Sequence, residues 1–187
     1  MKDLRVKKTY LFLKKALIEL LSKKSFEEIR VNDICNLAMV HRTTFYSHFS
    51  DKYELLDYCI KDVEQEIWEK ISHNTYSNNK DFYTKMVMSI LEYIGENKVF
   101  FKNILKKNSD SGFINIFTNA CISYIYEMLN KEEINGISHD VPIEVISQFY
   151  AGAVISTIIW WLKSDNSLSE TQLCNYIISL IFDIPHK

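Results

Sequence analysis

Residues that interrupt regular secondary structure are scarce in this chain, which has only 4 glycines and 2 prolines among its 187 residues. No stretch alternates apolar and polar side chains for long enough to predict a β-sheet. Hydrophobic residues make up 47% of the chain, which is enough to bury a core and excludes an overall disordered state. The sequence therefore predicts an all-α protein with about nine helices.

The sequence also lacks the motifs that enzymes and metal proteins usually carry. It has no glycine-rich phosphate loop, no nucleophile motif and no pair of histidines at the spacing of metal ligands. The 4 cysteines are too far apart for a metal clip, and their apolar surroundings are typical of buried thiols in a reducing compartment. We therefore predict that the protein is not an enzyme and binds neither a metal nor a cofactor.

Segments that would direct the chain to a membrane are missing as well. The first apolar run is interrupted by Lys14, Lys15 and Glu19, so no secretion signal is expected. The longest apolar run, residues 149–162, is too short to span a bilayer and predicts a buried helix instead. These observations predict a cytoplasmic protein that does not enter the membrane.

Charge is distributed unevenly, although the net charge of the whole chain is only −2. Residues 1–56 contain 11 Lys or Arg against 7 Asp or Glu, a net charge of +4. Residues 57–187 contain 11 against 17, a net charge of −6. A basic N-terminal part on an acidic body favours contact between that part and a polyanion such as a nucleic acid.

The N-terminal part is predicted to form three helices. The first, at residues 7–23, has apolar residues at three- and four-residue steps, and the second is expected at residues 31–37. A tight turn at residues 38–40 leads to a third helix at residues 41–47. A short helix, a tight turn and a second short helix, braced by an amphipathic helix, form a helix-turn-helix unit.

The third helix carries polar side chains at its start, and Phe45 and Phe49 are expected to anchor it to the core. An arginine can bond a guanine through two parallel hydrogen bonds, and a threonine can offer a methyl or a hydroxyl group to a base. The residues predicted to contact DNA bases are His41, Arg42 and Thr43. The residues predicted to contact DNA phosphates are Arg30, Thr44, Tyr46, His48 and Lys52. The predicted partner is therefore double-stranded DNA.

The rest of the chain is predicted to consist of longer helices. The fourth helix begins at a cap provided by Ser50 and runs to about residue 73, before a polar segment at residues 74–80. The others are expected at residues 81–96, 97–107, 111–130, 142–164 and 168–183. We assign residues 1–52 to a DNA-binding domain and residues 53–187 to a helical domain for dimerisation and ligand binding.

Many positions between residues 8 and 60 follow one further pattern: Phe26, Val31-Asn32-Asp33-Ile34, Ala38, Val40, Thr44-Phe45-Tyr46, Phe49 and Lys52-Tyr53-Glu54-Leu55-Leu56. With these positions at fixed spacing, the segment resembles the N-terminal domain of the TetR family of transcriptional regulators. The resemblance implies an all-helical homodimer, with N-terminal heads that bind operator DNA and C-terminal domains that usually hold a small effector. The sequences at residues 149–153 and 160–162 are similar to a branch of this family from low-GC Gram-positive bacteria. That branch includes a regulator of dihydroxyacetone kinase genes, which acts as an activator with a protein partner.

Departures from the family pattern bear on the expected geometry. Met39 stands where the family usually has glycine, so it should either strain the turn or force a different one. Ile29 and Arg30 replace a threonine pair that caps the second helix, so we expect that cap to be lost and Arg30 to contact phosphate through its charge. His41 and Thr43 replace a common serine and glycine, so the base preference of the family does not transfer.

Residues 149–162 are apolar on nearly every side, whereas a surface helix needs only one apolar stripe. Such a helix has to be covered by its own chain and by something else. We therefore predict that it forms, with the last helix, a two-fold four-helix interface with a second chain. The predicted interface residues are Phe149, Ala153, Ile158, Trp161, Leu173, Ile177, Leu180 and Ile181. Two heads spaced about one turn of DNA would read a palindromic site. The alternative to a dimer interface is that residues 149–162 form the central helix of a monomer.

A ligand pocket is a further expectation. The aromatic residues predicted to line it are Phe100, Phe101, Phe117, Tyr124 and Trp160. No cluster of convergent charges appears in this part of the chain, so the effector is expected to be small and apolar. The alternative is a body packed solid, with regulation by a protein partner or by none.

Together these patterns predict a sequence-specific DNA-binding transcriptional regulator. In the first reading it is a repressor that binds a palindromic operator as a homodimer and is released by a small apolar effector. In the alternative reading it is a helical interaction module, an activator that works with a protein partner and without a small-molecule effector.

Overall fold

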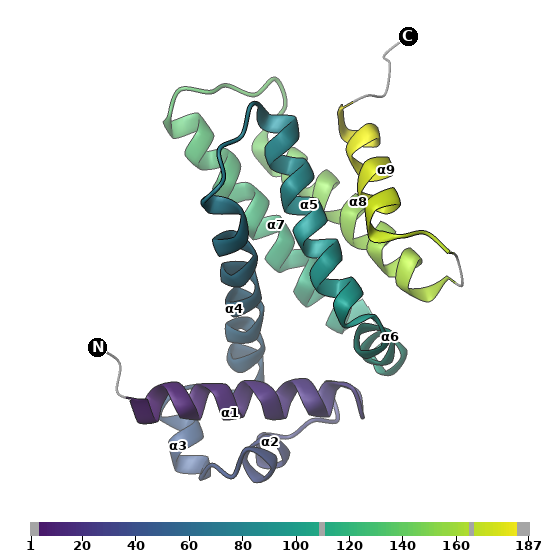
Figure 1. Cartoon of the computed structure of the whole chain (residues 1–187). Coiled ribbons are helices and arrows are strands. Elements are labelled where there is room, and N and C mark those ends of the chain that lie inside the picture. Colours follow the sequence, from purple (N-terminus) through teal and green to yellow (C-terminus); the bar gives the residue numbers. More distant parts are fainter. Residues whose placement is uncertain (1–3, 109–110, 165–166, 183–187) are drawn as a thin grey trace. The chain divides into compact units, whose positions relative to one another are not determined.

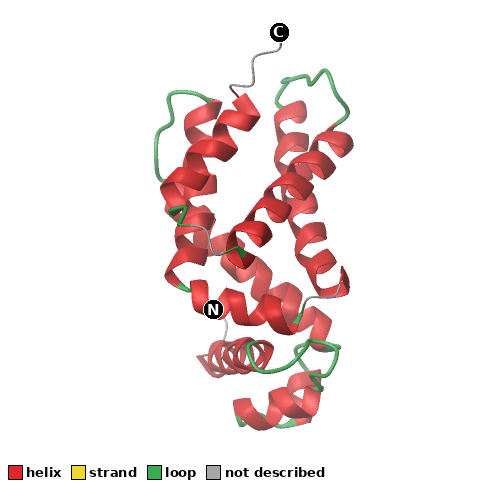
Figure 2. Cartoon of the chain, turned by 90° about the vertical axis from the view of Figure 1, so that its right-hand side faces the viewer, coloured by secondary structure: helices red, strands yellow, loops and turns green. Residues whose placement is uncertain are grey.

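The computed structural model describes residues 4–108, 111–164 and 167–182, and every regular element among them is a helix (Figures 1 and 2). The helices of these described residues are α1 (Leu4–Leu21), α2 (Val31–Ala38), α3 (Arg42–Tyr46), α4 (Lys52–Ser72), α5 (Asn79–Glu96), α6 (Lys98–Lys107), α7 (Ser111–Ile134), α8 (Ile143–Lys163) and α9 (Glu170–Phe182). Each predicted helix is present, so the predicted all-α class is confirmed. Residue 183, the predicted end of the last helix, lies outside the described residues.

Helix ends account for most differences between the predicted and observed elements, and α7 gives the clearest case. This helix was predicted to end at residue 130 but continues to Ile134. Gly136 then adopts a left-handed φ of 87°, and its N–H donates to the carbonyl oxygen of Glu133 at 2.9 Å. The N–H of Ile137 donates to the carbonyl oxygen of Glu132 at 3.0 Å, which completes a Schellman motif. The stop signal is therefore the glycine, and the prediction ended the helix too early.

The start of α4 shows a second difference. The carboxylate of Asp51 accepts hydrogen bonds from the N–H groups of Tyr53 at 2.8 Å and Glu54 at 2.9 Å, so Asp51 caps the helix. The prediction that Ser50 provides the cap is wrong. Ser50 instead donates through its N–H and its hydroxyl group to the carboxylate of Glu54, at 2.6 and 2.7 Å.

The chain divides into two compact units, Met1–Asn108 and Ser109–Lys187. In the first unit α1 packs against α2 and α4, α2 packs against α3, α4 against α5, and α5 against α6. In Figure 1, α1, α2 and α3 gather at the N-terminal end of α4. In the second unit α7 packs against α8. The functional boundary predicted after residue 52 lies inside the first unit and stays a prediction.

Two faces of α8 differ in exposure. Its buried residues are Ile143, Ser147, Ala151, Ile158, Trp161 and Leu162. Large apolar side chains on the other face are exposed, among them Val145, Phe149 and Trp160. The prediction of a buried helix is therefore only partly right. By length and composition alone, the whole of α8 is long and apolar enough to cross a membrane, with a mean hydropathy of 1.5 in its most apolar window. The expectation of a run too short to span a bilayer concerned residues 149–162 alone.

Candidate DNA-binding surface

A tight turn joins α2 to α3, and Met39 occupies its left-handed position with φ 54° and ψ 39°. The N–H of Met39 donates to the carbonyl oxygen of Asn36 at 3.3 Å, and the N–H of Val40 donates to that of Cys35 at 3.0 Å. Glycine usually fills this position, because a Cβ atom makes a left-handed backbone cost about 1–2 kcal/mol. Met39 keeps the tight turn and accepts the strain, which is the first of the two predicted outcomes.

Buried aromatic rings hold α3 in place from behind. Phe45 and Phe49, which were predicted to anchor the helix, are 0% and 4% exposed. Their ring centroids lie 5.8 Å apart, and the ring of Phe49 also lies 4.9 Å from that of Tyr10 on α1 and 5.7 Å from that of Tyr58 on α4. Because α3 has only five residues, it has little stability of its own, and this aromatic cluster fixes its position.

The three residues predicted to contact bases lie together on the exposed side of α3. His41 precedes the helix at its N-cap position, and Arg42 and Thr43 open the helix. All three side chains are exposed. The guanidinium group of Arg42 lies 5.7 Å from the centre of the Tyr46 ring one turn later, so the two side chains share one face. This arrangement leaves donors and acceptors free to meet base edges, and the contacts themselves stay a prediction.

The residues predicted to contact phosphates differ more in their surroundings. Arg30 and Tyr46 are exposed, and Thr44 is half-buried. His48 is half-buried, and its ring makes a T-shaped contact with the Tyr10 ring at a centroid distance of 5.2 Å. Lys52 is enclosed as well, because its side chain is only 13% exposed.

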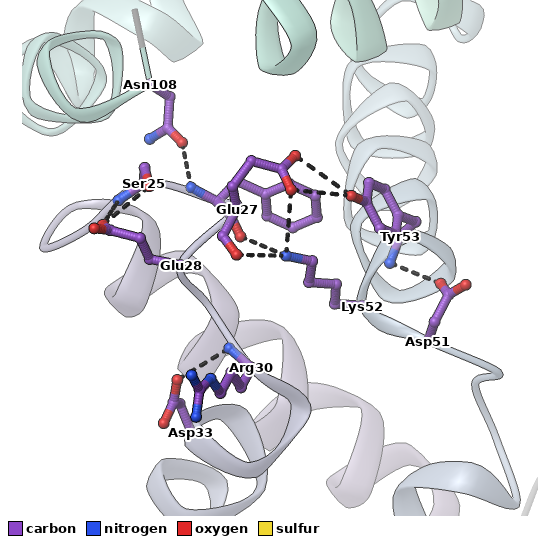
Figure 3. A network of polar contacts seen from close by, with 10 residues as sticks. Ser25, Glu27, Glu28, Arg30, Asp33, Asp51, Lys52, Tyr53 and Asn108 are labelled. Carbon is purple, nitrogen blue, oxygen red and sulfur yellow. Dashed lines mark hydrogen bonds and ion pairs between the residues drawn. The ribbon is translucent and has the colours of Figure 1, made fainter. Parts of the chain in front are cut away.

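Lys52 makes contacts inside the chain. Its ammonium group donates to the carbonyl oxygens of Phe26 at 2.8 Å and Glu27 at 3.1 Å, and lies 4.6 Å from the centre of the Phe26 ring (Figure 3). Two of its three N–H groups are thus used internally. The phosphate contact of Lys52 stays a prediction. This internal role could not be predicted from sequence, because the two carbonyl groups lie 26 and 25 residues away in the chain.

The start of α2 retains part of a capping arrangement. The carboxylate of Asp33 accepts a hydrogen bond from the ammonium group of Lys24 at 2.6 Å. It also accepts one from the N–H of Arg30 at 3.0 Å (Figure 3). These two hydrogen bonds, that of Lys24 first, hold the pKa of Asp33 below its usual value. The expectation that the cap is lost is therefore right for the side chain of Arg30, which caps nothing, but the reciprocal hydrogen bond from Asp33 is kept. Ile29, the other replaced residue, is buried in the core.

An ion pair between Lys14 on α1 and Asp62 on α4 ties the first helix to the fourth. Partial burial of Lys14 acts to lower its pKa, but the hydrogen bond and the charge of Asp62 outweigh this effect and raise the pKa above its usual value. Lys14 therefore stays charged and serves the packing of the head. Its charge is directed to a partner inside the chain.

The residues predicted for a dimer interface divide by exposure. Phe149 and Leu180 are 69% and 62% exposed, and Ala153 is exposed as well. Ile181 is half-buried. The remaining four are buried within the chain and are not available at its surface: Ile158, Trp161, Leu173 and Ile177. A helix that is apolar on most sides does not reveal from sequence which side faces its own core.

The residues predicted for an effector pocket lie in both units. Phe100 and Phe101 are neighbours on α6 with ring centroids 5.5 Å apart, whereas Phe117 and Tyr124 lie on α7 and Trp160 lies on α8. A single pocket formed by all five stays a prediction. A hollow of about 350 Å³ on the second unit has another lining, namely Ile122, Ser123, Tyr126, Glu127, Glu144, Ser147 and Gln148. Its two carboxylates do not suit an apolar effector.

Comparisons with known proteins agree with this geometry. The family model described as "Bacterial regulatory proteins, tetR family" matches residues 13–59, and the model described as "Transcriptional regulator C-terminal region" matches residues 81–183. The chain is 25% identical over 179 residues to the HTH-type dhaKLM operon transcriptional activator DhaS of Lactococcus lactis, and the match covers 92% of this chain and 90% of the relative.

Solved structures share the fold over nearly the whole chain. A TetR transcriptional regulator from Streptococcus agalactiae is 25% identical with a TM-score of 0.66, and the match covers 96% of this chain and 97% of that chain. The fatty acid degradation regulator FadR from Bacillus halodurans shares the fold at 15% identity, with a TM-score of 0.65 and coverage of 96% and 97%. With these matches, the exposed α3 and its buried anchors identify the chain as a member of the TetR family, a DNA-binding transcriptional regulator and not an enzyme.

Proposed function

We propose that two copies of this chain bind a palindromic operator through their α3 helices, and that the bound homodimer represses transcription. One observation carries the proposal: α3 presents the exposed Arg42 and Thr43 while the buried Phe45 and Phe49 hold it from behind. A helix with this geometry can insert side chains into the major groove. The proposed site of action is the cytoplasm, where bacterial DNA lies.

Within the proposed contact, residues of α3 and its surroundings have separate tasks. Arg42 reads a base through its guanidinium group, assisted by His41 and Thr43. The hydroxyl group of Tyr46 and the charge of Arg30 bind phosphates and fix the register of the head on the duplex. The contact between Arg42 and Tyr46 supports this division, because it keeps both side chains on one face of the helix.

Dimerisation is proposed to use the exposed faces of α8 and α9. On α8, Val145, Phe149 and Trp160 form an exposed apolar stripe, and Gly152 has open space where a Cβ atom would lie. On α9, Tyr176 and Leu180 are exposed one turn apart. A stripe of this kind is typical of a self-complementary two-fold interface. The buried members of the predicted interface would support this face from inside the protomer.

A second candidate is activation of transcription together with a protein partner. The relative from Lactococcus lactis is named as a transcriptional activator, which favours activation by this chain as well. The release of DNA by a small apolar effector belongs to the first candidate. A reporter gene behind the selected operator separates the two. Repression by the chain alone supports the first candidate, and a rise in transcription that needs a second protein supports the other.

The test of operator recognition is a selection from random duplex DNA with the wild type and with Arg42→Ala. We expect the variant to lose about 1–3 kcal/mol of binding free energy and to relax the sequence preference at one position of each half-site. Lys102→Ala is the matched control, because it removes an exposed positive charge from α6. A variant that selects the wild-type sequence with wild-type affinity would exclude Arg42 as a base-reading residue.

A further inference from the structure

Asn108 is the last residue of the first unit, and it is a polar residue with only 1% exposure. Burial of an amide side chain is costly unless its polar atoms are paired. Its Oδ1 atom accepts a hydrogen bond from the N–H of Phe26 at 2.6 Å, and its Nδ2 atom donates to the carbonyl oxygens of Ile104 at 3.0 Å and Leu21 at 3.4 Å. One side chain therefore connects α1, the α1–α2 loop and the last turn of α6. Figure 3 shows its hydrogen bond to the loop.

Two of these partners, the carbonyl group of Leu21 and the N–H of Phe26, are backbone groups at or beyond the end of α1. Leu21 is the final residue of α1, and the last carbonyl groups of a helix have no partner within it. The N–H of Phe26 belongs to a loop residue that is itself 1% exposed. Buried backbone groups of this kind need a partner in the folded chain. Asn108 supplies one over a sequence separation of 82 residues for Phe26 and 87 residues for Leu21.

Lys52 holds the same loop from α4. Its ammonium group donates to the carbonyl oxygen of Phe26 at 2.8 Å, while Asn108 accepts from the N–H of that residue. We call this pair of contacts, made by Asn108 and Lys52, the Phe26 clamp. The loop continues from Phe26 to Val31, where α2 begins, and α2 leads through the turn to α3. The clamp therefore sets where the helix-turn-helix unit starts.

We propose that Asn108 is a positioning residue for operator recognition. By holding the α1–α2 loop against the end of α6, it fixes the direction in which α2 and α3 leave that loop. The inference rests on the proposed function, because it assumes that α3 reads operator DNA. The distance between Asn108 and α3 in the sequence does not suggest such a role. Asn108 makes no contact with DNA in this proposal and acts only through the loop.

The first test compares Asn108→Leu with the wild type. Leucine has a similar size but leaves the N–H of Phe26 without its acceptor. We expect affinity for the selected operator to fall about 10-fold or more, while affinity for random duplex at low salt stays within about 3-fold, because phosphate contacts remain. Asn103→Leu is the matched control, since Asn103 is an exposed asparagine on the same helix. A folded Asn108→Leu protein with wild-type affinity and selectivity overturns the proposal.

A conservative variant separates positioning from general stability. Asn108→Asp keeps an acceptor for the N–H of Phe26 but loses the Nδ2 donor. We therefore expect it to retain more operator affinity than Asn108→Leu does when both are compared at equal folded fractions. Equal losses in the two variants would contradict a role that acts through the Phe26 hydrogen bond.

A second measurement needs no variant. If the intact hydrogen bonds of the Phe26 clamp raise the affinity for operator, then bound operator has to stabilise those hydrogen bonds by the same factor. We expect amide hydrogen exchange at Phe26 to slow when the wild type binds its operator, and to slow less with random duplex. The amide of Leu91, buried in α5, serves as the reference within the same unit. Exchange at Phe26 that is fast, or that does not respond to operator, overturns the proposal even if Asn108→Leu does not fold.

If the proposed function is wrong, the results differ from those that overturn the role of Asn108. The wild type would then bind no duplex even at low salt, and operator affinities could not be compared. Exchange at Phe26 without DNA would still be slow in the wild type and fast in Asn108→Leu, because the clamp is a property of the first unit alone.

Discussion

Among the described residues, Met39 is the one residue other than glycine with a positive φ. Its left-handed φ of 54° suits glycine. Because Met39 is 93% exposed, its side chain gains no packing energy that could offset the strain. The turn is nevertheless kept, because two backbone hydrogen bonds close it and the buried rings behind α3 fix the helix that follows. These hydrogen bonds and the packing of the buried rings therefore offset the strain at Met39.

We expect Met39→Gly to raise the free energy of unfolding by about 0.5–1 kcal/mol. The substitution removes left-handed strain of about 1–2 kcal/mol, and the greater freedom of glycine in the unfolded chain offsets part of this gain. Urea unfolding followed by circular dichroism measures the difference. Met39→Ala keeps the strain and should give no gain, so equal stabilisation by alanine and glycine would contradict this account.

Single residues also mark where sequence reasoning succeeds and where it stops. The exposure of Arg42 and Thr43 and the burial of Phe45 and Phe49 were predictable, because each follows from spacing within one short segment. The internal role of Lys52 was not, because its partners belong to another segment of the chain. Asn108 gave no signal at all, since a lone asparagine after a helix is usually a surface cap.

At the scale of elements, the first turn of α2 depends on one carboxylate. Asp33 accepts from Lys24 and from the N–H of Arg30, and so joins the end of the α1–α2 loop to the helix. The sequence pattern placed Asp33 near the start of the second predicted helix. It did not anticipate the contact with Lys24, because the loop between them folds back in a way that periodicity does not encode.

Asp33→Ala should lower the free energy of unfolding at neutral pH by about 0.5–1 kcal/mol, because the first turn of α2 loses its acceptor. The pKa of Asp33 is lower in the folded state than the usual value of about 3.9, so this stabilisation is complete above that value. It is lost as the pH falls through the folded-state pKa. The difference between wild type and variant should therefore shrink below about pH 4.

Urea unfolding from about pH 3 to pH 7 measures this difference. Asp57→Ala provides the control, since Asp57 is an exposed carboxylate whose partner Lys61 lies one turn along α4. A surface pair of this kind contributes little. The interpretation fails if Asp33→Ala and Asp57→Ala depend on pH in the same way.

At the scale of the whole molecule, α8 and α9 carry large apolar side chains that one chain leaves exposed, among them Phe149, Trp160 and Leu180. The absence of a polar face on α8 predicted an interface from sequence alone. The choice of face could not be predicted, because it depends on which residues the protomer itself buries, such as Trp161 and Ile158. The exposed Phe149 and Trp160 are therefore the better targets for mutation.

We expect Phe149→Glu to raise the dissociation constant of the homodimer by about 30-fold or more, because it puts a charge in the middle of the apolar stripe. Sedimentation over a range of concentrations measures this constant. Operator affinity should fall with it, since one head reads only half of a palindrome. Trp68→Glu is the control, because Trp68 is an exposed aromatic residue on α4, outside the stripe. Unchanged assembly of Phe149→Glu would exclude this face.

The hydrogen bond between Asn108 and Phe26 bears on how chimeric regulators should be built from this protein. A chimera that took only residues up to the end of α4 would receive the recognition helices without Asn108, whose amide holds the α1–α2 loop. The portable piece would then extend through the end of α6, about twice the length of the motif that makes the family recognisable. Swapping specificity between relatives by exchanging a few exposed side chains on α3 should, for the same reason, disturb less than swapping whole heads.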